Sequence, residues 1–103
     1  MQEEKAVCVS LRESIEFAEK GIVSKTLNDV PGSKSILFCM AAGQALSDHT
    51  APSGAVIHGV EGKGKIKLGA EEHDLTPATW VYMPAGLIHA IRAEENLTFT
   101  LTL

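Results

Sequence analysis

Hydrophobic and polar residues alternate along most of the chain, which predicts β-strands. In the stretch NLTFTLTL (96–103), leucine or phenylalanine fills every second position and threonine fills most of the others. Successive side chains of a strand point to opposite faces of its sheet, so this alternation gives one apolar face and one polar face. The stretch KGKIKLG (63–69) repeats the pattern with lysine as the polar residue. Both stretches are predicted to be half-buried strands.

Two other stretches, SILFCMAA (35–42) and AVIHGV (55–60), are apolar at nearly every position. A strand that is apolar on both sides must be covered on both sides. If these strands belong to the wall of a single barrel, their outer cover comes from a second subunit. We therefore expect a homodimer.

Only RESIEFAEKG (12–21) has a helical pattern, and it allows at most two or three turns before the stop at Gly21. Elsewhere, turn sequences rich in glycine, proline and asparagine separate the strands. Short strands broken in this way predict an all-β sandwich or barrel. With 103 residues, the chain is expected to form one domain, 1–103.

Charge and hydropathy argue against two classes of partner. The net charge is −4, and the nine lysine and arginine residues are scattered along the chain. Nucleic acids and anionic membrane surfaces are bound through clustered basic residues, so neither partner is expected. There is no apolar run of about 18 residues to span a bilayer, and the charged start MQEEKAVCVSLRE lacks an apolar signal core. We expect a cytoplasmic location.

The two cysteines, Cys8 and Cys39, each lie in an apolar, strand-like run. Neither has a second cysteine nearby, which excludes a Cys-x-x-Cys redox or zinc motif. Both are predicted to be buried, reduced and inert.

Two short patterns of glycine, histidine and proline stand out in the chain. The first is formed by Gly43, His49 and Gly62, and the second is PAGLIH (84–89), which ends at His89. They resemble the two signature motifs of the cupin superfamily. The first cupin motif reads glycine, five residues, His-x-His, three or four residues, glutamate, six residues, glycine, and Gly43, His49 and Gly62 occupy its frame without gaps. The second contains Pro-x-Gly-x-x-His, which PAGLIH matches.

The resemblance implies an all-β fold, the double-stranded β-helix or jelly-roll barrel that is also called RmlC-like. It implies an N-terminal extension of about 1–34 and a conserved barrel of about 35–103. In small cupins that stand alone, an N-terminal segment such as IVSKTL (22–27) can form a strand shared between the subunits of a dimer.

The chain departs from the cupin pattern at positions that usually bind metal. A cupin metal site usually has three histidines and a glutamate. Ala51 stands where the second histidine is expected, and Ala55 stands where the glutamate is expected. Only His49 and His89 remain, and the opening glycine of the second motif is replaced by Ala78.

Two interpretations of His49 and His89 stay open. In the first, they weakly hold a divalent metal (zinc, iron, manganese or nickel), with water, a small ligand or Cys39 completing the coordination. In the second, no metal is bound, and the two imidazoles form hydrogen bonds with an organic ligand or with each other. No cofactor follows with certainty from the sequence.

The remaining acidic and histidine side chains are weak candidates. Alternation places Ile57 inside the barrel and His58 outside it, so His58 is a poor ligand and is expected in a covered outer layer near a subunit interface. His73 lies beside a charged hairpin turn and is expected in solvent. Neither Asp48 nor Asp74 has a position that favours the interior.

An apolar ligand pocket is expected around the two histidines. Its predicted lining residues are His49, Ile57, Met83 and His89. Trp80 and Tyr82 share one face of their strand. Val81 and Met83 share the other, and the sequence leaves open which face lines the pocket.

Three functions follow from these observations. The first is a small cupin that binds a small molecule near His49 and His89, since no nucleophile, base and acid stand together in the sequence. The second is a metal-dependent enzyme of dioxygenase or isomerase type with an incomplete set of protein ligands. The third is a metal-free enzyme with histidine as general base, which lacks a convergent cation because Arg92 is expected on the opposite face from His89.

Overall fold

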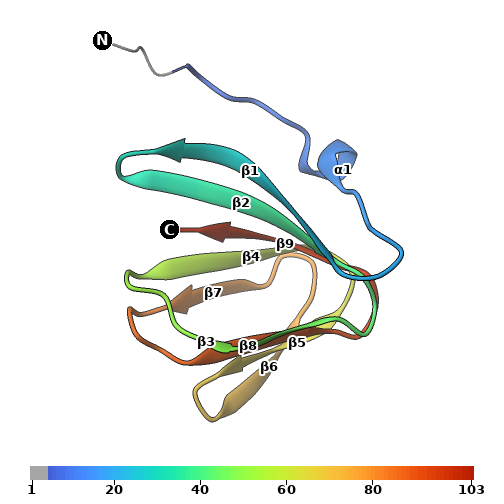
Figure 1. Cartoon of the computed structure of the whole chain (residues 1–103). Helices are drawn as coiled ribbons and strands as arrows, with labels where there is room; N and C mark the ends of the chain where they lie inside the picture. Colours follow the sequence, from blue (N-terminus) through green and yellow to red (C-terminus); the bar gives the residue numbers. More distant parts are fainter. Residues whose placement is uncertain (1–4) are drawn as a thin grey trace.

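Residues 5–103 are described by the computed structural model, and they form two antiparallel sheets that face each other, with one short helix outside them (Figure 1). The helix α1 spans Leu11–Ser14. The strands are β1 (Ile22–Val30), β2 (Ser33–Met40), β3 (Ala45–His49), β4 (Ala55–Glu61), β5 (Gly64–Leu68), β6 (Glu71–Leu75), β7 (Trp80–Met83), β8 (His89–Ala93) and β9 (Leu97–Thr102). The five-stranded sheet has the order β1-β2-β9-β4-β7, and the four-stranded sheet has the order β3-β8-β5-β6. The all-β barrel predicted from the sequence is confirmed.

The core lies between the two sheets and is built by the alternating positions of their strands. Phe99 of β9 is 1% exposed, and its ring stacks on Phe38 of β2 with the ring centroids 5.2 Å apart. Ile66 of β5 and Ile91 of β8 face them from the four-stranded sheet and are also buried. The half-buried strands expected in 96–103 and 63–69 are therefore β9 and β5.

The outer face of β2 is covered by the chain itself. Residues 5–21, which we call the N-terminal strap, pass outside the five-stranded sheet (Figure 1). Arg12 forms an ion pair with Glu61 of β4 at 3.0 Å, and Glu16 forms one with Lys25 of β1, also at 3.0 Å. Since β2 and β9 lie between β1 and β4, the strap crosses both strands.

Three side chains beneath this crossing are completely buried, although they lie outside the core cluster: Leu37, Cys39 and Thr98. These side chains are buried within one chain, so their cover does not require a second subunit, and the homodimer stays a prediction. Alternation identified the second apolar face correctly, and the strap lies on that side of the sheet. Cys39 is buried as expected, whereas Cys8 in the strap is exposed.

The helix is shorter than the pattern in 12–21 allows. Ser10 caps it by accepting a hydrogen bond from the backbone N–H of Glu13 at 3.2 Å, and the helix ends at Ser14. Ile15 already has extended backbone angles. After this single turn, the ion pair between Glu16 and Lys25 ties the strap to the sheet.

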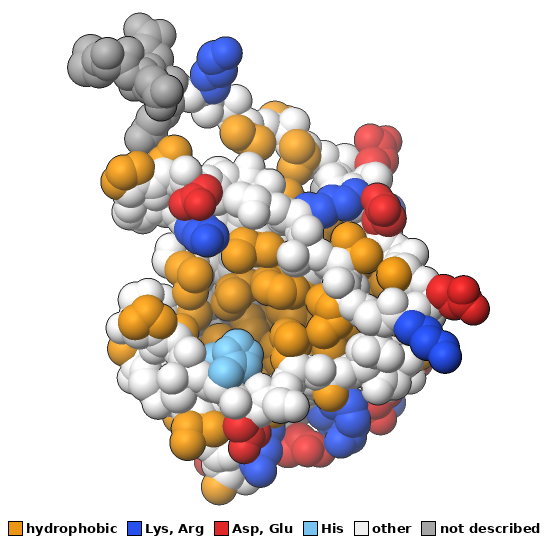
Figure 2. All heavy atoms as spheres, in the orientation of Figure 1, with side chains coloured by type: hydrophobic (Ala, Val, Ile, Leu, Met, Phe, Trp, Pro, Cys, Tyr) orange, Lys and Arg blue, Asp and Glu red, His pale blue; other side chains and the backbone are white. Residues whose placement is uncertain are grey.

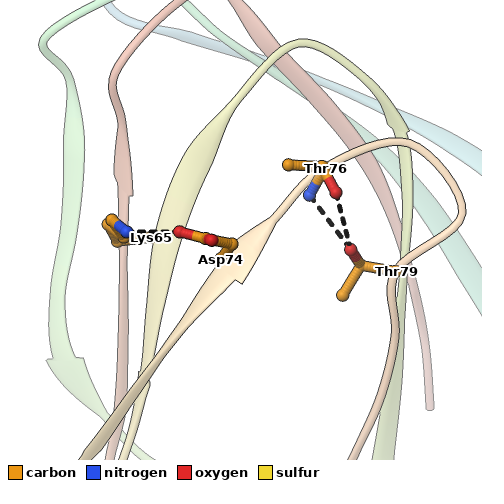
Figure 3. A network of polar contacts seen from close by, with 4 residues as sticks. All are labelled: Lys65, Asp74, Thr76 and Thr79. Carbon is orange, nitrogen blue, oxygen red and sulfur yellow. Dashed lines mark hydrogen bonds and ion pairs between the residues drawn. The ribbon is translucent and has the colours of Figure 1, made fainter.

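The loop between β6 and β7 folds back onto β4. The backbone N–H of Gly59 donates to the carbonyl of Thr79 at 2.8 Å, and the N–H of Ala78 donates to the carbonyl of Gly59 at 2.9 Å. Inside the loop, the N–H of Thr76 donates to the hydroxyl of Thr79 at 3.1 Å (Figure 3). Figure 3 also shows the ion pair between Lys65 and Asp74 on the neighbouring β5–β6 hairpin.

Ala78 in this loop has φ of 70°, in the left-handed region where a Cβ is strained. This is the position where the second cupin motif carries glycine. We expect Ala78→Gly to raise the free energy of unfolding by about 1 kcal/mol, because glycine adopts this conformation without steric cost. Urea denaturation of both proteins measures the change. Ala85 lies in another turn and does not have a positive φ, so Ala85→Gly is the control and should not raise the free energy of unfolding.

Candidate ligand site at the barrel mouth

Two histidines from neighbouring strands lie together on the inner face of the four-stranded sheet. His49 of β3 is directly opposite His89 of β8, and their ring centroids are 4.3 Å apart with the ring planes at 55°. The structure thus brings together the two residues that the cupin motifs single out.

A β-bulge in β3 makes this pairing possible. Leu46 is opposite Ile91, His49 is opposite His89, and the register shifts between the two pairs. In a regular strand, positions 46 and 49 would point to opposite faces. The bulge brings both side chains to the inner face, which is a known use of bulges beside functional sites.

His89 is the buried member of the pair, and its side chain has a fixed role. It is 5% exposed, and its Nδ1 lies 3.2 Å from the carbonyl oxygen of Leu87. A carbonyl only accepts hydrogen bonds, so Nδ1 carries the proton and donates it. In the neutral imidazole, Nε2 is then a free acceptor beside His49. The contribution of the Leu87 carbonyl could not be predicted from the sequence, because alternation does not show where a loop carbonyl points.

His49 lies at the exposed rim of the same site. Partial burial, and in second place the nearby His89, lower the pKa of the His49 imidazole below its usual value of about 6.5. His49 is therefore neutral at pH 7 and can donate or accept a hydrogen bond.

The lowered pKa of His49 has a measurable consequence. Below about pH 6.5 the unfolded chain binds a proton at His49 before the folded chain does, so stability falls as the pH drops through this range and is restored above it. We expect the NMR titration midpoint of His49 to lie below 6.5 and to rise in His89→Leu, where one of its two causes is removed. A midpoint that does not change in this variant would contradict the coupling of the two rings.

The positions of the missing cupin ligands do not complete a metal centre. Ala55 is 2% exposed and belongs to the core, while Ala51 precedes it in the loop and accepts a hydrogen bond from the N–H of Gly86 at 2.9 Å. Within residues 5–103, no three His, Cys, Asp or Glu side chains lie close enough to hold a metal ion. Cys39 points to the outer face beneath the strap and is not available as a third ligand. Two imidazoles alone do not fit the usual cupin metal site.

Apolar side chains surround the histidine pair. Figure 2 shows a hollow lined by hydrophobic side chains at the open end of the barrel, with a histidine at its edge. Ile57 and Met83, at 1% and 2% exposure, form the buried floor of the barrel. Phe38, Leu46 and Leu101 are only partly buried where they pack against this core, so they belong to its accessible wall.

The structure also settles which face of β7 points inward. Val81 and Met83 are buried in the core, whereas Trp80 and Tyr82 are 64% and 55% exposed on the outer face. The two aromatic residues therefore take no part in the barrel site. They lie beside His58 on the outer surface, since His58 of β4 is directly opposite Trp80.

The other candidate side chains are directed away from the barrel interior or lie in solvent. His58 is exposed on the outer face, as its parity predicts. His73 is exposed and lies 3.3 Å from the carboxylate of Glu71. Asp74 forms an ion pair with Lys65, and Arg92 is exposed on the face opposite His89.

The chain forms two facing antiparallel sheets, and the two motifs supply a histidine pair at the open end between them. These features define the chain as a cupin. Residues 35–103 match the family model of the AraC-like ligand binding domain, and the chain belongs to this family. A comparison with curated proteins gives no significant match.

Solved structures agree on the fold. A cupin superfamily protein from Desulfitobacterium hafniense has a TM-score of 0.84 at 24% identity, with 99% of this chain and 91% of that chain covered. A conserved protein of unknown function from Streptococcus pyogenes also has a TM-score of 0.84 at 24% identity, with coverages of 97% and 88%. A cupin 2 conserved barrel domain protein from Leptotrichia buccalis has a TM-score of 0.83 at 30% identity, with 89% of this chain and 45% of that chain covered. No helix within residues 5–103 is long and apolar enough to cross a membrane.

Proposed function

We propose that the barrel binds a small, largely apolar organic molecule that carries a hydroxyl group, and that His49 and His89 receive this group. The observation that carries the proposal is the hydrogen bond from His89 Nδ1 to the Leu87 carbonyl. It leaves Nε2 as an acceptor in an apolar surrounding, and such an acceptor pairs best with an O–H or N–H donor of the ligand.

The charges around the barrel support a neutral ligand over a phosphorylated one. Lys65 and Lys67 of β5 alternate with the buried Ile66 and so lie on the outer face, together with Arg92 of β8. An anionic ligand in the barrel would meet two imidazoles and no cation from these strands. The apolar wall around Phe38, Leu46 and Leu101 suits a hydrocarbon ring or chain.

A thermal-shift screen tests this proposal with phenol, cyclohexanol and benzyl alcohol against benzene, benzoate and glucose 6-phosphate. The hydroxyl compounds should raise the melting temperature most, and His89→Leu should remove the difference between phenol and benzene. His58→Leu is the matched control, because it replaces an exposed histidine on the outer face of β4 and should leave binding unchanged. Equal binding of phenol by wild type and His89→Leu would refute the role of His89.

A metal-dependent activity of dioxygenase or isomerase type is the second candidate. The observation in its favour is the 4.3 Å separation of the two rings on neighbouring strands, at which two imidazoles can be directed at one ion. Metal analysis of untagged protein tests it. Near-stoichiometric metal that disappears in His49→Ala/His89→Ala would favour this function over the binding of a neutral ligand.

A further inference from the structure

A groove of about 390 Å³ lies between the free edges of the two sheets. β7 ends the five-stranded sheet and pairs only with β4, while β6 ends the four-stranded sheet and pairs only with β5. Trp80 and Tyr82 of β7 line the groove together with Leu68, His73 and Asp74 of the β5–β6 hairpin. The histidine pair of the barrel mouth is not among the lining residues. The volume lies in the range of about 300–1,000 Å³ that is usual for sites of small molecules.

The two aromatic side chains of this groove are exposed to solvent. Trp80 and Tyr82 are the single tryptophan and the single tyrosine of the chain, and they are 64% and 55% exposed. They lie two positions apart on β7 and therefore share one face of the strand. Exposed rings contribute little to the core, but they offer a ligand a flat apolar surface with a polar tip.

The backbone of the same two residues is directed to the groove. The N–H of Gly59 donates to the carbonyl of Thr79 at 2.8 Å, so these two residues form a hydrogen-bonded pair at the start of β7. Along antiparallel strands, hydrogen-bonded pairs alternate with non-hydrogen-bonded pairs. The pairs that Trp80 and Tyr82 form with β4 are therefore non-hydrogen-bonded, and their N–H and C=O groups point to the free edge. Neither residue forms a further backbone hydrogen bond within residues 5–103.

Among the lining residues, no ionic charge is left without a partner. The carboxylate of Asp74 forms an ion pair with Lys65 and points toward it (Figure 3). Nε2 of His73 lies 3.3 Å from the carboxylate of Glu71. Because that carboxylate only accepts hydrogen bonds, Nε2 of the neutral ring donates and Nδ1 is an acceptor. Aromatic rings also bind organic cations, but the carboxylates that would assist such a ligand are already engaged here. The groove therefore favours a neutral ligand.

We propose that this groove is a second ligand site, for a neutral planar heterocycle whose edge carries a hydrogen-bond donor next to an acceptor, such as the cyclic amide of a nucleobase. This edge exchanges two hydrogen bonds with the N–H and C=O of Trp80, as directly opposed residues do across antiparallel strands. The flat face of the heterocycle stacks on the exposed rings of Trp80 and Tyr82, because every base offers a π surface to an aromatic side chain.

Two other occupants fit the groove less well. An added peptide strand would find little to pair with, since β7 has four residues and only two of them direct their backbone groups to the edge. A phosphorylated nucleotide would leave its charge without a partner, because no lysine or arginine is among the described residues that line the groove. The ligand is therefore a free base or a nucleoside rather than a nucleotide.

Tryptophan fluorescence tests the site directly, because Trp80 is the only tryptophan of the chain. Inosine is neutral at neutral pH and carries a cyclic amide, and it should quench this fluorescence with a saturable dependence on concentration. The compound 1-methylinosine lacks the N–H donor of that amide and should bind about tenfold more weakly, as expected for one lost hydrogen bond. Failure of inosine to quench, or equal binding of the two nucleosides, would overturn the proposal.

Three variants locate the bound inosine. Tyr82→Leu removes one stacking ring and should weaken binding about fivefold or more. Ile88→Ala is the matched control, because Ile88 is an apolar residue of 54% exposure that does not line the groove, and its binding should equal that of the wild type. His49→Leu should also leave inosine binding unchanged, so the result does not depend on the function proposed for the barrel. Loss of binding in His49→Leu but not in Tyr82→Leu would place inosine in the barrel and overturn the groove site.

Backbone amide signals in NMR spectra test the hydrogen bonds to the strand edge. The N–H of Trp80 points to the groove, whereas the N–H of Val81 points to β4. Inosine should therefore shift the amide signal of Trp80 more than that of Val81. An equal or larger shift at Val81, or no shift at Trp80, would contradict pairing with the free edge of β7.

Discussion

Gly59→Ala should be among the most destabilising single substitutions in this protein. A Cβ at position 59 would lie 2.0 Å from the carbonyl oxygen of Thr76 and 3.4 Å from the side chain of Leu75. The nearer contact is with backbone, so no rotamer change relieves it. Moving the loop away would break the two hydrogen bonds that join Gly59 to Thr79 and Ala78. We expect a loss of about 3 kcal/mol or more in the free energy of unfolding, which is a large share of the stability of a small domain.

Gly54→Ala is the matched control for this experiment. Gly54 comes just before β4, and a Cβ there would meet only the ring end of Tyr82, with the hydroxyl at 2.8 Å. Tyr82 is 55% exposed and can move into solvent. Chemical denaturation should therefore show a change below about 1 kcal/mol for Gly54→Ala. Similar losses in both variants would show that the contact between β4 and the β6–β7 loop is not tight.

The importance of Gly59 could not be predicted from the sequence. The stretch 55–60 correctly indicated a strand with Ile57 inside and His58 outside, because alternation depends only on neighbouring residues. The contact with Thr76 depends on how a loop 17 positions later folds back, and no local pattern carries that information. A glycine within a strand signals a close approach but does not name the partner.

The same limit applies to burial. Alternation in 96–103 correctly placed Phe99 inside and the threonines outside, and it suggested that the threonine face is open. Thr98 is nevertheless completely buried, because the strap tied down by Arg12 and Glu16 passes over it. Periodicity shows that a strand has two faces, but the cover of the second face comes from a distant segment.

The histidine pair was found by its spacing within two motifs, and alternation alone would have failed at this point. The bulge between Leu46 and His49 changes the parity of β3, and the residues between them, Ser47 and Asp48, do not by themselves identify a bulge. The alanines of the incomplete ligand set were also visible in the sequence. The position of the Leu87 carbonyl could not be predicted from the sequence. This carbonyl determines the tautomer of His89 and therefore which hydrogen bonds the site can form.

Ala51→His/Ala55→Glu should convert the barrel site into a metal site. These substitutions add the two ligand types that the cupin pattern carries at those positions, next to the existing pair of His49 and His89. Ala55 is 2% exposed in the core, so a carboxylate there is held away from bulk water. Three histidines and one glutamate suit zinc, and we expect zinc to bind about a thousandfold or more tightly than it binds to the wild type. Isothermal titration calorimetry measures this change.

Without metal, the same two substitutions should lower the stability of the barrel. A buried carboxylate with no partner costs about 3 kcal/mol or more unless it takes up a proton, so Ala51→His/Ala55→Glu should be less stable than the wild type in the presence of EDTA. Zinc at about a hundred times its dissociation constant should return about 2.7 kcal/mol. Stability that rises with zinc in the variant, but not in the wild type, would show that the metal binds the folded barrel.

Ala51→His/Ala90→Glu controls for the added charge and the added histidine. Ala90 of β8 is opposite Lys67 on the outer face, so a glutamate there does not reach the histidine pair. Weak zinc binding in this control and tight binding in Ala51→His/Ala55→Glu would show that the two alanines are what prevents a complete metal centre in the natural chain. If Ala51→His/Ala55→Glu also binds weakly, the backbone around the bulge in β3 holds His49 in an orientation suited to hydrogen bonding rather than to coordination. In that case the departure from the metal-binding cupins extends beyond the two alanines to the geometry of the strand.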